Sequence, residues 1–138
     1  MSVEIEFPVE VVVPGVPLSL QASAASREKW KNRIREAALR ELPAGYFASE
    51  EPIKVIIYYF SDAPARVDID NIVKPILDSL SQFIYVDDKQ VEQLAVQKFE
   101  PGRLFTFASP SSRLAETIDA EGPRVYLQVD ASSVGEVK

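Results

Sequence analysis

The run Ile53–Phe60, which reads IKVIIYYF, limits most strongly what this chain can fold into. Lys54 is its one charged residue, and every other position is apolar or aromatic. A strand without polar alternation is typical of the middle of a sheet that other elements cover on both faces. The run therefore predicts a central strand, flanked by further strands and packed by helices.

Four other segments carry strand-like patterns bounded by turn residues. The first is β-rich from Val3 to Val13, is densest over Val9–Val13, and ends at the breaker Pro14-Gly15-Val16-Pro17. The other three are expected at residues 91–99, 104–107 and 124–129. Strands interleaved with helical patterns favour an α/β or α+β domain.

Two long helices and one short helix are expected between these strands. The first spans residues 23–42, where an apolar stripe recurs every four residues and Pro43 ends the pattern. The second spans residues 70–83, with Asp70, Lys74 and Asp78 on the face opposite its apolar arc. Pro75 is expected near the first turn of that helix, where a missing N–H costs little. The short helix is expected at residues 111–120.

These elements predict an α+β fold, with a mixed β-sheet packed by two main helices. A length of 138 residues fits one domain, which we place at residues 1–130, followed by a flexible polar tail at 131–138. No apolar run approaches the roughly 20 residues of a membrane span, and the N-terminus lacks a signal-peptide pattern. We therefore expect a cytoplasmic protein without a membrane partner.

The chain contains no cysteine and no histidine. Thiolate nucleophiles, histidine bases and the usual nitrogen or sulfur ligands of zinc are therefore excluded. Any bound metal must be held by oxygen, which favours magnesium, manganese or calcium.

Charge is distributed unevenly along the chain. The formal net charge of −6, from 21 acids and 15 bases, argues against a nucleic-acid-binding protein when taken alone. The expected first helix is nevertheless basic, because residues 27–40 carry six bases against Glu28 and Glu36. Those bases are Arg27, Lys29, Lys31, Arg33, Arg35 and Arg40. Such a helix is either a solvated face or a surface for DNA.

Acids gather instead in the middle of the chain, at Asp68, Asp70, Asp78, Asp87 and Asp88. Asp70 or Asn71 would suffice to cap the second helix, which leaves Asp68 surplus to that role. If the Asp87-Asp88 pair returns to the start of the helix, three or four carboxylates meet and repel one another unless a cation binds. Magnesium held by carboxylates supports phosphodiester hydrolysis, so the pattern favours that chemistry.

The complete pattern is D-x-D-N-x-x-K-x-x-x-D, followed by an apolar stretch and D-D-x-Q-V, and it resembles the RusA family of Holliday-junction resolvases. Its positions here are Asp68, Asp70, Asn71, Lys74, Asp78, Asp87, Asp88, Gln90 and Val91. The resemblance extends back to the opening strand and forward to Lys98-Phe99.

This resemblance implies a small α+β homodimer that nicks four-way DNA junctions with magnesium, for which manganese can substitute. It implies that Asp68, Asp70 and Asp88 are catalytic metal ligands, with Asp87 as the other candidate ligand, and that Lys74 is a catalytic cation facing the phosphate. The implied supporting residues are Asn71, Asp78 and Lys98, with Asp78 orienting Lys74 from one turn away. The expected DNA-binding residues are Arg27, Lys29, Lys31, Arg33, Arg35 and Arg66.

The chain departs from the family pattern in three respects. Arg66 is the one base directly before Asp68, the whole chain is acidic, and residues 108–122 resemble an insertion. Two alternatives therefore remain open: a non-cleaving DNA-binding dimer of the same fold, and a magnesium phosphoesterase acting on flaps or other branched DNA.

Overall fold

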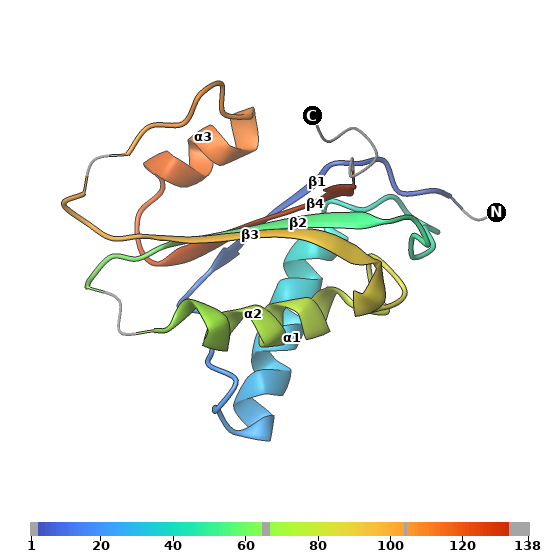
Figure 1. The fold of residues 1–138 in the computed structure, drawn as a ribbon, viewed down its shortest axis with the longest axis horizontal. Coiled ribbons are helices and arrows are strands. Elements are labelled where there is room, and N and C mark those ends of the chain that lie inside the picture. Colours follow the sequence, from blue (N-terminus) through green and yellow to red (C-terminus); the bar gives the residue numbers. More distant parts are fainter. Residues whose placement is uncertain (1–2, 65–66, 104, 133–138) are drawn as a thin grey trace.

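The computed structural model describes residues 3–64, 67–103 and 105–132, and it shows the predicted α+β arrangement in one domain (Figure 1). Along the chain its elements are β1 (Val9–Pro14), α1 (Ala24–Leu39), β2 (Ile53–Phe60), α2 (Ile69–Leu80), the 3₁₀ turn η1 (Asp88–Gln90), β3 (Val91–Phe99), α3 (Ser112–Asp119) and β4 (Arg124–Ala131). The strands at 53–60 and 91–99 have the bounds that the sequence predicts.

The four strands form one mixed sheet in the order β1-β4-β2-β3. β2 pairs with β3 in parallel and with β4 in antiparallel register, so that Ile57 lies opposite both Val96 and Leu127. The prediction that β2 is a central strand is therefore confirmed. Because parallel strands need a crossover connection, α2 lies between β2 and β3 in the chain and packs against the sheet.

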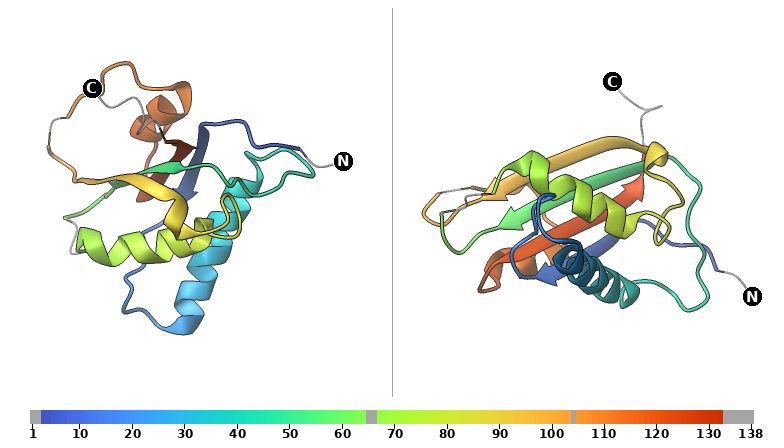
Figure 2. Two further views of the ribbon diagram at one scale, coloured as in Figure 1. Left: turned by 45° about the vertical axis from the view of Figure 1, so that its right-hand side comes forward. Right: turned by 90° about the horizontal axis from the view of Figure 1, so that it is seen from below.

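Helices α1 and α2 cover the same face of the sheet, while α3 lies over the opposite face (Figures 1 and 2). Alternate residues of β2, among them Val55 and Ile57, are fully buried beneath α1 and α2. The opposite face is less completely covered, since Lys54 and Ile56 are only half-buried. The expectation of cover on both faces is met only near Phe60, where a second cluster forms with Phe99, Leu114 and Tyr126.

Pro75 lies in the second turn of α2 and is buried, so its expected place in the first turn is wrong. Within a helix, proline removes the hydrogen bond to the carbonyl four residues earlier, here that of Asn71. That carbonyl instead accepts a hydrogen bond from the backbone N–H of Leu20, at 2.8 Å. The proline therefore leaves an acceptor on α2 that fixes the segment leading into α1.

Both long helices are shorter than expected. α1 ends at Leu39, and Arg40 caps it by donating its backbone N–H to the Ala38 carbonyl. α2 ends at Leu80, because the backbone at Ser81 is extended and Gln82 has a positive φ of 59°.

The strands near the two ends of the chain have other bounds than predicted, and residues 105–107 do not form the strand predicted there. β1 starts at Val9 rather than Val3. Residues 105–107 form no strand; instead Phe105 and Phe107 pack on Phe99, with ring centroids 4.6 and 5.3 Å away. The strand predicted there is therefore wrong: contacts between aromatic rings, rather than strand pairing, hold these residues against the sheet.

The polar tail begins later than expected. Ala131 still belongs to β4, and the N–H of Ser132 donates to the Pro52 carbonyl at 2.8 Å. The remaining tail residues, 133–138, lie outside the described residues. Among the described residues, no helix is both long and apolar enough to cross a membrane.

Candidate functional site

Lys74, on the exposed face of α2, lies between two carboxylates. Its Nζ is 2.7 Å from Oδ1 of Asp78, one turn further along the helix, and 3.4 Å from Oδ2 of Asp88 in the loop after α2. The side chains of Lys74, Asp78 and Asp88 are 53%, 44% and 32% exposed. The acidic pair thus does return to α2, through Asp88, and the expected contact between Asp78 and Lys74 is formed.

The hydrogen bond to Asp78 raises the pKa of Lys74 above its ordinary value; desolvation opposes this effect, and the charges of Asp78 and Asp88 add to it. Lys74 therefore carries a positive charge throughout the neutral and mildly alkaline range. A fixed ammonium on a solvent-facing helix surface can stabilise negative charge on a bound phosphate.

Tyr85 holds Asp88 from beneath. Its side chain is fully buried, and its hydroxyl donates to Oδ1 of Asp88 at 2.9 Å. Burial raises the pKa of Tyr85, and the charge of Asp88 raises it further, so the phenol stays a neutral donor. With Oδ1 held by Tyr85, Oδ2 of Asp88 faces Lys74. The role of Tyr85 was not predicted from the sequence; the signal that could have revealed it is a hydroxyl within an apolar run, three residues before Asp88.

Gln90 fixes the loop that carries the acidic pair. Its Oε1 accepts hydrogen bonds from the backbone N–H groups of Val86 and Asp87, each at 2.9 Å. Its Nε2 donates to the carbonyls of Ser49 at 2.8 Å and Glu51 at 2.9 Å. The amide thus uses both donors and both acceptor directions, and it ties the loop to the segment before β2. The family motif contains this glutamine, but spacing alone did not reveal its role.

Asp87 has a structural role that differs from that of Asp88. Its Oδ1 accepts the N–H of Lys89 at 2.9 Å, which caps η1. The structure thus provides a local reason for each member of the pair: Asp87 shapes the turn, and Asp88 faces Lys74.

Asp68 and Asp70 lie at the start of α2 and are both exposed. Asp68, and not Asp70 or Asn71 as predicted, occupies the N-cap position of α2. It makes no side-chain capping bond, although its carbonyl accepts the N–H of Asn71 at 3.1 Å. Asp70 lies in the first turn. Asp68 and Asp70 are absent from the ion pairs among the described residues, whereas Lys74 already pairs with two other acids.

The expected gathering of three or four carboxylates is therefore not formed. Among the residues that the structure describes, no three acidic, histidine or cysteine side chains lie close enough to hold a metal ion. The donor chemistry of Asp68, Asp70 and Asp88 does fit a hard divalent cation, because all three offer carboxylate oxygens.

Lys98, at the end of β3, donates its Nζ to the Val67 carbonyl at 3.0 Å. It thereby holds the segment directly before Asp68 against the sheet, which fits the supporting role expected of it. Arg66 lies outside the described residues.

Arg35 lines the groove between α1 and α2, and its guanidinium is also bound to the end of α2, a structural role that the sequence did not predict. Its Nε donates to the Ser79 carbonyl at 2.9 Å, its Nη2 donates to the Ser81 carbonyl at 3.1 Å, and its guanidinium lies 5.2 Å from the ring centre of Phe83. The last carbonyls of a helix lack partners within the helix, so a cation there completes their hydrogen bonding. Arg35 therefore clamps α1 to the end of α2.

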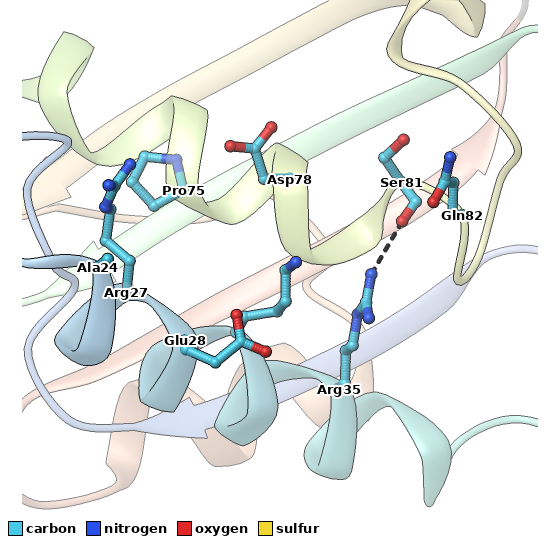
Figure 3. A pocket seen from close by; sticks show the side chains of 9 residues that line it. Ala24, Arg27, Glu28, Arg35, Pro75, Asp78, Ser81 and Gln82 are labelled. Atoms are coloured by element: carbon cyan, nitrogen blue, oxygen red, sulfur yellow. Dashed lines mark hydrogen bonds between the residues drawn. The ribbon is translucent and has the colours of Figure 1, made fainter.

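The remaining bases of α1 lie on two flanks. Arg27 and Lys31 line the groove between α1 and α2 that Asp78 also lines (Figure 3). Lys29 and Arg33 lie on the other flank, beside Leu18, and Nη1 of Arg33 is 3.4 Å from the Pro14 carbonyl. The basic helix is therefore not one continuous face.

Comparison with known protein families assigns the chain to one of them. The family model described as endodeoxyribonuclease RusA matches residues 21–106, more than half of the chain, and the protein therefore belongs to this family of endodeoxyribonucleases. The matched segment contains α1, β2, α2 and β3, and with them Lys74, Asp78, Tyr85 and Asp88. Among curated proteins, none matches the chain.

Proposed function

We propose that the protein is a magnesium-dependent endodeoxyribonuclease that cuts four-way DNA junctions as a homodimer. The observation that carries this proposal is the position of Lys74, which two carboxylates hold on the open face of α2 within the family-matched segment. A surface that only binds DNA has no need of carboxylates, because they repel phosphate.

Lys74 and the acidic residues of the candidate site each have a role in the proposed reaction. Asp68, Asp70 and Asp88 would hold the magnesium ion, which would supply an activated water and shield charge on the phosphate. Lys74 stabilises the negative charge that develops on the scissile phosphate, and Asp78 keeps its ammonium in place. Tyr85 holds Asp88 in the orientation that faces the helix.

A two-fold dimer suits a junction substrate. A four-way junction offers two symmetry-related strands, and two copies of one chain present two equivalent sites to them. A monomer that makes paired symmetric nicks at micromolar concentration, as judged by light scattering, would contradict this part of the proposal.

The test compares a synthetic four-way junction, a flap and a plain duplex, each with magnesium, with manganese or with EDTA. We expect paired nicks in the junction with either metal and none in EDTA. Full cleavage in EDTA would refute the metal requirement. Junction binding without cleavage would identify a non-cleaving DNA-binding dimer, and cleavage of the flap alone would identify a flap phosphoesterase.

Two substitutions separate the roles of the acid and the lysine. Asp70→Asn should abolish cleavage and weaken magnesium binding, while junction binding stays intact because less negative charge faces the phosphate. Lys74→Ala should also abolish cleavage, but with magnesium affinity unchanged or improved. Asp119→Asn, which removes one exposed charge at the end of α3, is the matched control and should cut normally. Wild-type cleavage rates in both site variants would refute the site.

A further inference from the structure

A groove of about 380 Å³ lies between α1 and α2, and Asp78, the partner of Lys74, forms part of its wall. Arg27, Lys31 and Arg35 line it from α1, and Pro75 and Asp78 line it from α2 (Figure 3). Of the basic side chains that line the groove, Arg35 is the one that, among the described residues, is hydrogen-bonded across it to the end of α2.

We propose that this groove holds the DNA backbone next to the cleavage site, with Arg27 and Lys31 contacting phosphates while Lys29 and Arg33 do not. The inference rests on the proposed nuclease function and narrows it to one flank of α1. It assigns DNA binding to Arg27 and Lys31, and it excludes Lys29 and Arg33 from DNA binding, although the charge pattern alone had grouped all four together.

The charges in the groove favour an anion. Arg27, Lys31 and Arg35 contribute three positive charges, against the carboxylates of Glu28 and Asp78. The nearest cation to Asp78 is Lys74, at 2.7 Å, which balances that carboxylate. Within the described part of the chain, neither Arg27 nor Lys31 takes part in an ion pair, so both charges are available to a ligand.

The spacing of these cations favours a polymer over a single small anion. Arg27, Lys31 and Arg35 recur every four residues, which is about 6 Å of helix rise per step. They therefore form a row along the groove rather than one converging site. A row of cations matches a chain of phosphates, each of which carries one negative charge.

The groove also leads to the candidate site. Asp78 is both a wall of the groove and a partner of Lys74, and Lys74 in turn reaches Asp88. A strand lying along the row of cations thus passes from the α1–α2 groove to the face of α2 where Lys74 lies. The Arg35 clamp keeps the two helices at a fixed spacing for that strand.

The experiment compares two double variants with equal charge changes on opposite flanks of one helix. Arg27→Gln/Lys31→Gln removes the groove charges, and Lys29→Gln/Arg33→Gln removes the control charges. Binding of a labelled four-way junction is measured by fluorescence anisotropy in EDTA over a series of salt concentrations, so that no cleavage is required. Each lost phosphate contact lowers the slope of log affinity against log salt by about 0.9.

We expect the groove variant to bind at least tenfold more weakly at low salt and to lose about two from its salt slope. The control variant should keep the wild-type slope. Lys31→Arg, which keeps the charge, should bind like the wild type, and thermal unfolding confirms that every variant is folded. Equal losses in the two double variants, or no loss in the groove variant, would overturn the proposal.

Failure of this inference is distinct from failure of the nuclease proposal. If the wild-type protein cuts junctions while the groove variant keeps its salt slope, the groove is wrong and the nuclease function stands. If the wild-type protein binds junctions through the groove but cuts nothing with magnesium, the nuclease proposal fails and the groove is supported.

Discussion

Replacing Gln90 with leucine should both destabilise the protein and displace the loop that carries Asp87 and Asp88. Leucine keeps most of the side-chain volume but removes all four hydrogen bonds that the amide makes, at 2.8–2.9 Å, to the backbone around Val86 and Ser49. A typical intramolecular hydrogen bond contributes about 0.5–1.5 kcal/mol net. Three of the four lie at the surface, where water replaces them readily, so the low end applies and the total is about 2 kcal/mol.

Urea unfolding monitored by circular dichroism measures this loss directly, because the midpoint shifts without a change in slope when only stability changes. Gln90→Glu is the informative companion. It keeps the acceptor toward Val86 and Asp87 but places a carboxylate against the carbonyls of Ser49 and Glu51, and so should be no more stable than Gln90→Leu. A cost below about 0.5 kcal/mol for Gln90→Leu, with magnesium-dependent cleavage unchanged, would refute the assignment of Gln90 as the residue that positions this loop.

Three further outcomes follow from the contacts. Arg35→Gln should cost about 2 kcal/mol in urea unfolding, since hydrogen bonds from a charged group are the stronger kind, and an unchanged midpoint would rule out the clamp. Burial and the hydrogen bond to Glu10 raise the pKa of Tyr126. The contribution of this tyrosine to stability is therefore complete below pH 10 and is lost as the pH rises further. A melting temperature that stays constant from pH 9 to 11 would contradict this. Asp87→Ala should lower the free energy of unfolding by about 1 kcal/mol and retain cleavage. Asp88→Asn should retain stability and lose cleavage. The opposite results in unfolding and nicking assays would exchange the roles of the two residues.

The features that the sequence predicted well are those set by local patterns. Ile53–Phe60 and Val91–Phe99 were placed correctly because strand composition and the flanking turn residues are visible in the chain itself. Residues 105–107 read FTF and also have strand-like composition, but their structure depends on Phe99, whose ring lies within packing distance only in the folded state. Such a contact cannot be deduced from a local pattern.

In the candidate site, too, the features set by local sequence were predicted, and those set by tertiary packing were not. Spacing and family resemblance identified Lys74, Asp78 and Asp88 as neighbours, because one turn of helix and one returning loop bring them together. Which flank of α1 faces α2 depends on how the two helices dock, so counting charges could not separate Arg35, which completes the end of α2, from Lys29 on the far side.

The family-matched segment supplies only part of the main hydrophobic core. β1 and β4 lie outside residues 21–106, yet β4 pairs with β2 along its whole length, and Leu127 is fully buried in the core that also holds Ile57. The site therefore rests on a sheet whose order, β1-β4-β2-β3, places an unmatched strand at its centre.

The extra segment at residues 108–122 has a different relation to the site. Its helix α3 is anchored on the far face of the sheet, where Glu10 accepts hydrogen bonds from the hydroxyls of Ser111 and Tyr126 and where Leu114 is buried beside Phe60. Because α1, α2 and Lys74 lie on the other face, α3 contributes to the stability of the sheet without touching the candidate site (Figure 1). Arg113 of α3 also pairs with Glu41, directly after α1, so substitutions within α3 can act on the candidate site through the sheet and through this contact. Substitutions in β4 act on the strand that pairs with β2 directly.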